Sequence, residues 1–421
     1  MENNKKISPD MWMPLDKSQK DAEKVSRKSL TFWQDAKRRL KQNKVAMVSM
    51  YIIAFIILVC VFVPFFWPLT YADQNLDFAN IPMSLEIYEM PDGSYIYMNK
   101  EYKLIDVEKD GTLLRMIKMQ KDDTNNRKYI YNINGKELIV DYSLFMEAKK
   151  EYMALEKQAK KDPSIDLTEA QFKMDNAKKV ELKLDGVELL PTKKIKNKTY
   201  IWGTDNLGRD MFIRVLHGGR ISLIVGFVAA FVNFVIGVLY GGISGYFGGR
   251  VDNIMMRIVD IISSIPTLLY VILLMVIMEN GLLPIIVALS ATYWLQMARL
   301  VRGQVLTLKE QEFVMAAQTL GASTKRIMIK HLIPNMMGPI MVSITMQIPN
   351  AIFTEAFLSF VGLGISAPMA SWGSLCNDAL TGFMTYPYQL FFPAMAISVT
   401  MLAFNLFGDG LRDALDPKQR K

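Results

Sequence analysis

Two amide side chains and one carboxyl side chain interrupt a long apolar run in the second half of the sequence. The run covers residues 336–360 and contains Gln347, Asn350 and Glu355. Polar and ionisable side chains inside a membrane span usually face a bundle interior or water, because contact with lipid is costly. Their chemistry is hydrogen bonding along a polar path rather than covalent catalysis. We predict that these residues line a pathway; alternatively Glu355, which lies late in the run, stabilises packing near its end.

Residues that usually carry catalysis or bind metals are scarce. The chain has two cysteines, Cys60 and Cys376, and two histidines, His217 and His331. Neither a disulfide framework nor a thiolate or zinc site can be built from them with confidence. No nucleophile–base constellation is recognisable, and GASTK at 321–325 lacks the Gly-Lys pair of a phosphate-binding loop. The sequence therefore predicts a non-catalytic chain that binds no metal or cofactor itself.

A polar, basic segment between two apolar runs has the spacing of a bent helical pair. Ala316 and Ala317, after Met315, favour helix with little bulk, and Gly321 permits a sharp change of direction. Helix can resume at TKRIMIK, and Pro334 is predicted to end it before the next apolar run. The pattern predicts two short helices at an angle, whose small side chains let the backbone enter a groove on another protein.

These elements must be held in a membrane. Of the 421 residues, 51% are hydrophobic, which is too many for an ordinary soluble protein, yet 21% are charged. Apolar runs of spanning or nearly spanning length occur at 45–67, 221–246, 261–278, 282–297, 336–360 and 390–407, and only the run 336–360 contains a charged residue, Glu355. Basic residues gather before the first run, between the second and third, between the fourth and fifth, and after the last. The sequence predicts an all-α polytopic membrane protein with six transmembrane helices and both termini in the cytoplasm.

The chain ahead of the first run, residues 1–44, is a basic tail. Within it, Leu30, Trp33 and Leu40 have roughly helical spacing against a basic face. This pattern predicts an interfacial elbow helix, and the alternative is a basic flank that only sets orientation. No cleavable signal peptide is apparent, so the first run is expected to remain as a membrane anchor.

The second apolar run contains Gly237, Gly241 and Gly245, which form two consecutive GxxxG steps. Small residues one turn apart let helix backbones approach closely in lipid. The pattern predicts tight helix packing at these glycines.

Residues 72–200 have the character of a near-neutral soluble domain. Alternating strand patterns flank Asp110-Gly111 and Asn134-Gly135, which are hairpin signals. A helical pattern follows at DYSLFMEAKKEYMALEKQAKK, and VELKLDGVELL returns to alternation. We predict an inserted extracytoplasmic α+β domain. It is either a solvated domain whose charges serve solubility or a docking or gating surface for an external partner.

The segment from Met315 to Pro334 resembles the coupling-helix loop of ABC importer permeases. Further stretches resemble the C-type transmembrane subunit of the dipeptide/oligopeptide (peptide/nickel) permease family: WGTDNLGRD, GGRISL, GYFGGRVDNIMMRIVDI, ARLVRGQVLTLKEQEF, EAFLSFVGLG, SWG and AFNLFGDGLRDALDP. The resemblance runs from about 201 to 417, and it implies a permease domain there with its coupling loop at 309–335. Two features depart from the family pattern, because Met315 replaces the usual Glu and the insertion at 72–200 is unusually long.

The resemblance implies a permease subunit of an ATP-driven peptide importer in the bacterial cell membrane. The implied partners are the lipid bilayer, a homologous second permease subunit, two cytoplasmic ATPase subunits that hold ATP and Mg, and an extracytoplasmic peptide-binding protein. No nucleic-acid partner is implied. Met315, Ala316, Ala317, Gly321 and Pro334 would couple to the ATPases. Lys325, Arg326 and Lys330 would either pair with acids on that partner or only set topology.

Other functions stay open from the sequence. A nickel or other small-solute permease of the same family is one, although no His, Cys or Met pattern suggests a metal route. A membrane-anchored peptide sensor is another, and an enzyme is the least supported class.

Overall fold

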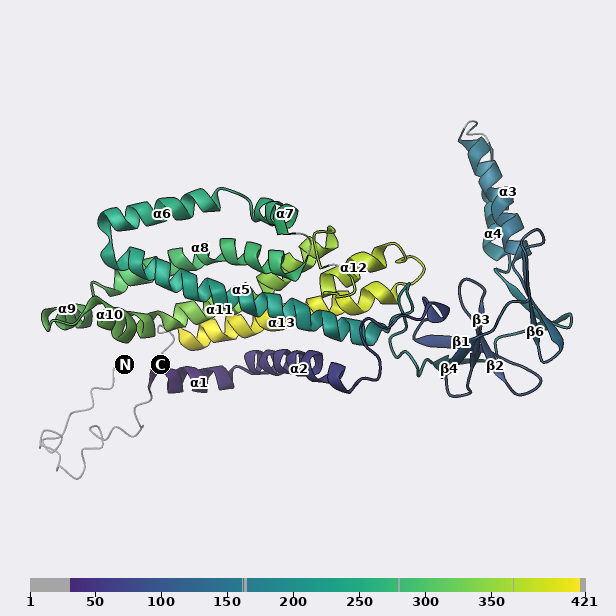
Figure 1. Ribbon diagram of the computed structural model, residues 1–421, viewed down its shortest axis with the longest axis horizontal. Helices are drawn as coiled ribbons and strands as arrows, with labels where there is room; N and C mark the ends of the chain where they lie inside the picture. The colour runs from purple at the N-terminus through teal and green to yellow at the C-terminus, as the bar shows by residue number, and fades with distance from the viewer. Residues whose placement is uncertain (1–30, 161, 163–164, 279–280, 366, 417–421) are drawn as a thin grey trace, which may run out of the picture.

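The computed structural model describes residues 31–160, 162, 165–278, 281–365 and 367–416. A helical bundle forms one part of the molecule, and a β-rich domain lies at one end of it (Figure 1). This inserted domain, residues 72–200, lies in the sequence between α2 (Lys44–Phe66) and α5 (Met211–Phe247). The prediction for the first 30 residues of the basic tail, including Leu30, lies outside the described residues.

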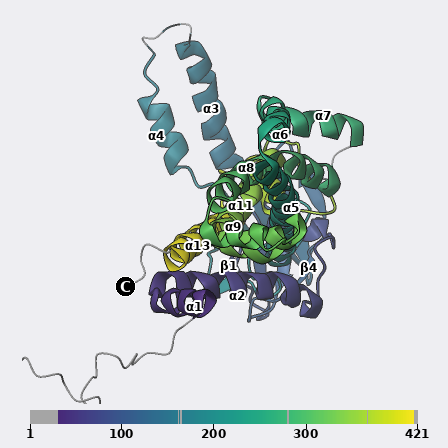
Figure 2. The same cartoon turned by 90° about the vertical axis from the view of Figure 1, so that its left-hand side faces the viewer.

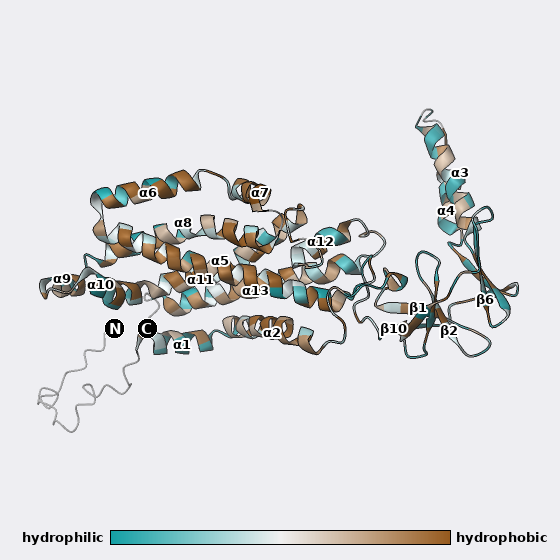
Figure 3. Cartoon of the chain, viewed as in Figure 1, coloured by the Kyte–Doolittle hydropathy of each residue, from teal (hydrophilic) through white to brown (hydrophobic). Residues whose placement is uncertain are grey.

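The bundle contains the apolar helices. Besides α2 and α5 it comprises α1 (Phe32–Gln42), α6 (Gly249–Ser263), α7 (Thr267–Met278), α8 (Leu282–Leu308), α9 (Glu312–Thr319), α10 (Thr324–Ile327), α11 (Ile333–Phe360), α12 (Trp372–Leu380) and α13 (Tyr388–Leu415). Five helices in the described ranges are long and apolar enough to cross a membrane, or up to six if one bent pair counts as a span. Apolar residues dominate these helices and polar ones the inserted domain (Figure 3). The fold is that of a helical polytopic membrane protein.

Helix α1 forms where the elbow helix is predicted. Thr31 and Gln34 cap its start reciprocally, and Arg39 donates from Nη1 to the carbonyl oxygen of Asp416 at 3.0 Å. These contacts tie α1 to the end of α13, while Trp33 stays half exposed. The helix itself is confirmed; its location at a membrane surface stays a prediction.

The predicted glycine row lies where α5 meets α8. A Cβ at Gly237 would lie 2.5 Å from the Met297 Cβ, and one at Gly245 would lie 2.9 Å from the Arg302 carbonyl oxygen. A Cβ at Gly241 would overlap the Ala298 carbonyl oxygen. The absence of side chains at these positions therefore sets how closely α5 and α8 approach.

The third predicted span, 261–278, is wrong as a single straight helix. Helix α6 starts earlier, at Gly249, and α7 follows after a break with a bend of 76°. Pro266 explains the break, because proline has no backbone N–H and disfavours helix at the preceding residue. Ion pairs from Arg302 to Asp252 and from Arg299 to Asp260 hold α6 against α8.

The inserted domain contains two antiparallel five-stranded sheets. The first has the order β10-β1-β2-β3-β4 and the second β5-β6-β7-β8-β9. The strands are β1 (Ser84–Glu89), β2 (Tyr95–Met98), β3 (Leu104–Val107), β4 (Leu113–Met116), β5 (Lys121–Asp123), β6 (Lys128–Ile133), β7 (Lys136–Asp141), β8 (Glu181–Leu184), β9 (Val187–Leu189) and β10 (Lys193–Lys196). Both predicted hairpins are confirmed: Asp110-Gly111 joins β3 to β4, and Asn134-Gly135 joins β6 to β7.

The predicted helix of this domain forms one arm of a helical hairpin. It is α3 (Ser143–Ala159), and α4 (Thr168–Asn176) packs beside it. The hairpin projects upward in Figures 1 and 2, away from the two sheets of the domain. Its surface includes exposed apolar side chains at Met153 and Phe172.

Hydrogen bonds fix the inserted domain to the start of α13. The Tyr388 hydroxyl donates toward the carbonyl oxygens of Thr204 at 2.7 Å and Ile81 at 3.1 Å. Gln389 donates from Nε2 to Asn80 Oδ1 and to the Thr204 carbonyl oxygen, both at 3.0 Å. Ile81 and Thr204 also form hydrogen bonds with each other. The chain segments that enter and leave the inserted domain therefore meet at one buried point, beside the start of α13.

A buried ion cluster supports this junction from the bundle side. Asp205 accepts from Arg209 Nε at 2.7 Å and also from Arg214, and each of the three residues is at most 5% exposed. Arg214 reaches Asp378 of α12 at 3.5 Å. The stretch WGTDNLGRD thus builds the connection between domain and bundle rather than a catalytic site.

Candidate functional site

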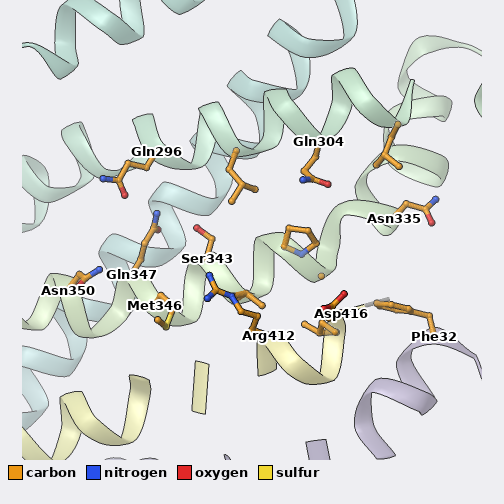
Figure 4. Close-up of a pocket in the computed structure, with 16 residues that line it drawn as sticks. Phe32, Gln296, Gln304, Asn335, Ser343, Met346, Gln347, Asn350, Arg412 and Asp416 are labelled. Atoms are coloured by element: carbon orange, nitrogen blue, oxygen red, sulfur yellow. The ribbon is translucent and has the colours of Figure 1, made fainter. Parts of the chain in front are cut away.

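A polar groove runs along one flank of the bundle. It encloses about 750 Å³ between α8, α11 and the end of α13, with α1 at one edge (Figure 4). Its lining residues are Phe32, Gln296, Leu300, Gln304, Leu308, Asn335, Gly338, Pro339, Val342, Ser343, Met346, Gln347, Asn350, Arg412, Leu415 and Asp416. Half of its lining residues carry hydrogen-bonding side chains.

Helical spacing explains how these polar groups come together. Gln296 and Gln304 lie two four-residue steps apart on α8, and Ser343 and Gln347 lie one such step apart on α11, so each pair shares a helix face. Side chains from α8 point toward α11 and those from α11 toward α8 (Figure 4). The Gln347 amide oxygen is buried and has no hydrogen-bond partner among the described residues. That unpaired acceptor is suited to a ligand or water in the groove.

The end of the groove near α1 carries charge as well as amides. Arg412 comes from the last turn of α13, Asp416 directly follows that helix, and Asn335 comes from the start of α11. The rest of the lining is neutral, with glutamine, asparagine and serine among aliphatic side chains. Such a wall can hydrogen-bond to a chain of peptide groups without requiring one particular side chain.

Of the three predicted pathway residues, Gln347 and Asn350 line the groove and Glu355 does not. Glu355 is fully buried among helices α5, α11 and α12. Its carboxylate oxygens accept from the hydroxyls of Ser222 and Ser359, each at 2.8 Å. The structure thus corresponds to the packing alternative for Glu355, because serines from distant segments surround the carboxylate.

The predicted bend lies at the opposite end of the bundle from the inserted domain (Figure 1). After α9, the amide of Ala322 donates to Ala317 O at 3.0 Å and that of Gly321 to Gln318 O at 2.9 Å. This pair of bonds is a Schellman helix end, and Gly321 supplies the left-handed residue it needs, with φ +75°. Space around Gly321 is open. The glycine is therefore required for backbone conformation rather than for room.

The predicted coupling residues do not all face outward. Met315, Ala316 and Gly321 are exposed, whereas Ala317 is buried in a core formed by α8, α9 and α11. The tip of the bend is instead Leu320, which is 87% exposed and which the sequence reasoning missed. The exposed surface of the bend thus combines small residues with one large apolar side chain.

The prediction that Pro334 ends a helix is wrong. Helix runs without interruption from Thr324 to Phe360, through α10, a wide π-helical turn at Met328–Leu332 (η4) and α11. Pro334 lies in the first turn of α11, directly after the wide turn. The changed hydrogen-bond spacing there accommodates a residue that lacks an N–H. One 37-residue helix therefore joins the bend to the groove.

Sequence reasoning also missed most of the groove. Gln296, Gln304 and Ser343 are each ordinary polar residues in apolar surroundings, but their four-residue and eight-residue spacings were available as a signal. Arg412 could not be assigned to the groove, because only packing of α13 beside α11 brings it there. Within the described ranges, no group of three or more His, Cys, Asp or Glu side chains could hold a metal ion.

Comparison with known families defines the class of protein. The binding-protein-dependent transport system inner membrane component family matches residues 221–421. The N-terminal TM domain of oligopeptide transport permease C matches residues 31–84. The chain is thus a non-catalytic, multi-pass subunit of a bacterial membrane transport system.

Full-length relatives narrow this class. The chain is 39% identical over 415 residues to the oligopeptide transport system permease protein OppC of Bacillus subtilis (strain 168), covering 99% of both chains. It is also 39% identical to the dipeptide transport system permease protein DppC of the same organism, covering 98% of this chain and 94% of that one. The chain belongs to the family of C-type permease subunits of oligopeptide and dipeptide transport systems.

A shorter relative matches over half of the chain. The OppC protein of Escherichia coli (strain K12) is 49% identical over 221 residues, which are 52% of this chain and 73% of that one. Among solved structures, a chain of the inward-facing MetNI methionine ABC transporter has a TM-score of 0.41 and 22% identity, over 49% of this chain and 98% of that one.

Proposed function

We propose that this chain is the permease subunit of an ATP-driven peptide importer and that its groove forms half of the translocation pathway. The observation that carries the proposal is the continuous helix from Thr324 to Phe360, which links the exposed bend to Gln347 and Asn350 in the groove. A displacement of the bend would be transmitted along this helix to the groove wall. Force applied at one end therefore changes the shape of the pathway.

The bend lies on the cytoplasmic side in this proposal, and the inserted domain lies outside. Exposed Lys325, Arg326 and Lys330 beside the bend support this orientation. The six transmembrane segments are then α2, α5, the bent pair α6–α7, α8, α11 and α13. Both described chain ends, near α1 and the end of α13, lie on the side of the bend (Figure 1).

The remaining partners follow from the family and from the open flank of the groove. A second, homologous permease subunit would cover the groove and complete the pathway. Two cytoplasmic ATPase subunits would receive the bends of the two permeases and would hold ATP and Mg. An extracytoplasmic binding protein would deliver peptide, with the inserted domain as its docking surface.

Peptides fit the chemistry of the groove better than a metal ion does. Amide and hydroxyl groups at Gln296, Gln304, Ser343, Gln347 and Asn350 match the donors and acceptors of a peptide backbone, which all peptides share. The relatives described above carry oligopeptide and dipeptide transport names. Both observations favour peptide over nickel as the cargo.

The test is substitution of Gly321 in the complete reconstituted transporter. Gly321→Ala should strain the left-handed residue by about 1–2 kcal/mol and displace the bend from its ATPase site. We expect peptide uptake and peptide-stimulated ATP hydrolysis to fall together. Gly303→Ala is the matched control, because an added methyl group meets open space there too, but within a regular helix of α8.

The proposal fails if Gly321→Ala leaves coupling unchanged, or if both glycine variants lose it equally. Cross-linking of a cysteine at Leu320 to the ATPase subunit provides a second measurement that is independent of activity. No cross-link in the intact transporter would place the bend outside the interface.

A further inference from the structure

A second cleft lies where the inserted domain meets the bundle, apart from the groove. It encloses about 640 Å³ between the first sheet, the segment before β8 and the connection from α12 to α13. Its lining residues are Pro82, Ser84, Glu86, Tyr88, Tyr97, Met98, Asn99, Lys100, Tyr102, Lys179, Val180, Lys194, Met384 and Thr385. Pockets of this size accommodate small organic ligands.

The strand register explains why one face of the first sheet is open here. Side chains alternate along β1, so Ser84, Glu86 and Tyr88 share a face, while Leu85 and Ile87 point into the core on the other face. Farther along the open face, Ile96 packs against the second sheet. The second sheet therefore covers only part of this face, and the uncovered part is the floor of the cleft.

The charges of the cleft are unbalanced. Glu86 pairs with Lys194 at 3.8 Å across the β1–β10 register. Lys100 donates a hydrogen bond from Nζ to the carbonyl oxygen of Thr385, and its Nζ lies 5.1 Å from the centre of the Tyr386 ring. Lys179 has no ion-pair partner in the described part of the chain. The ammonium group of Lys179 is therefore available to pair with the carboxylate of a ligand.

Tyrosines give the cleft its apolar and hydrogen-bonding surface. Tyr88 and Tyr102 line it and are partly exposed, whereas Tyr97, which also borders it, pairs with Ile87 on the core face of the sheet and is almost fully buried. Burial, with a further contribution from the Glu86 charge, raises the pKa of Tyr88, so its hydroxyl stays protonated at neutral pH and can donate. Tyrosine offers a large apolar ring with a polar tip, a combination common at recognition surfaces.

We propose that this cleft binds a short peptide, whose carboxylate contacts Lys179 and whose side chains pack against the tyrosines. This proposal rests on the peptide-import function proposed above and adds a cargo site outside the groove. The hydrogen bonds of Tyr388 and Gln389 fix the cleft relative to the bundle, at the end opposite the bend. A peptide bound in the cleft would therefore lie beside the start of α13, and the other end of this helix lines the groove.

The test is peptide binding to the full-length chain in lipid nanodiscs, without ATPase or binding protein. The probe is a tetrapeptide with a fluorophore on its amino end and a free carboxyl terminus, and binding is followed by anisotropy. We expect Lys179→Glu and Tyr88→Ala each to weaken binding about tenfold, a loss typical of one charge-assisted contact. Lys179 is exposed, so its substitution should not disturb folding.

Two matched variants serve as controls. Lys149→Glu and Tyr152→Ala make the same changes on α3, away from the cleft, and should leave binding unchanged. A tetrapeptide with an amidated carboxyl terminus should bind to the original chain about as weakly as the free acid binds to Lys179→Glu.

The proposal is overturned if the probe does not bind, or if cleft and control variants bind it equally. It is also overturned if the cleft variants weaken only the capture of an external binding protein. Uptake by the complete transporter separates the two proposals. If the complete transporter takes up peptide normally but the cleft binds none, only the proposed cleft site is wrong. If the unaltered transporter takes up no peptide, the proposed import function is wrong.

Discussion

Single side chains in the same kind of sequence context have different roles in this protein. Gln347 and Glu355 are polar residues in one apolar run, yet Gln347 lines the groove and Glu355 is enclosed by serines. The sequence could predict that both avoid lipid, because that follows from their chemistry. It could not separate them, because Ser222 belongs to α5, far away in the chain.

The buried ion cluster at the junction leads to a prediction for Asp205. Asp205→Asn removes the negative charge between Arg209 and Arg214, which are both almost fully buried. Loss of one partner of a buried pair leaves uncompensated charge and costs about 3–5 kcal/mol. We expect a clear fall in the thermal unfolding midpoint of the purified chain in nanodiscs, measured by tryptophan fluorescence.

Asp110→Asn is the matched control for this change. Asp110 pairs with Lys198 on the surface of the inserted domain, where 44% and 60% of the two side chains are exposed. Solvent screens such pairs, so the midpoint should not move measurably. Equal effects of the two substitutions would show that the buried cluster has no special importance.

At the scale of elements, local signals predicted turns well and helix ends poorly. Asn134 and Gly135 both have positive φ, as a tight hairpin turn requires, so this hairpin could be predicted from two residues. Helices α5 and α8 extend beyond their apolar runs, because a helix continues into polar surroundings when it packs on neighbours. The two prolines also differ, because Pro266 lies in the break between α6 and α7, whereas a wide turn accommodates Pro334 within a continuous helix.

The contact between α5 and α8 leads to a prediction for Gly241. Gly241→Ala would place a methyl group on the Ala298 carbonyl oxygen, so the helices must separate. Overpacking of this kind typically costs about 1–3 kcal/mol. The thermal midpoint in nanodiscs should fall. Gly303→Ala should leave it unchanged or slightly raised, because alanine favours helix and meets nothing there. A tolerated Gly241→Ala would contradict the packing role of the glycine row.

At the scale of the whole molecule, the inserted domain is fixed to the bundle rather than tethered to it. The sequence predicted the domain from its change in composition. It could not predict the junction, because Ile81, Thr204 and Tyr388 meet only after three distant segments fold.

The junction leads to a prediction for Tyr388. Tyr388→Phe removes a buried hydroxyl, but the Ile81 carbonyl oxygen keeps the Thr204 amide as a donor and the Thr204 carbonyl oxygen keeps Gln389, so the loss should be that of one hydrogen bond, about 0.5–1.5 kcal/mol. Amide hydrogen exchange should become faster around residues 80–82 and 200–205, with little change in the second sheet. Tyr386→Phe is the matched control, and it should not alter exchange at these positions. Unchanged exchange in Tyr388→Phe would show that the hydroxyl does not hold the domain.

The lateral opening of the groove has a consequence for how cells must manage this protein. If a second permease subunit covers the groove, as proposed above, a copy that inserts alone would present glutamine and asparagine amides to hydrocarbon, which cannot satisfy them. An unassembled copy of this kind should be degraded by membrane quality-control proteases faster than the assembled subunit. We therefore expect overproduction of this chain without the proposed second subunit to shorten its lifetime in the membrane.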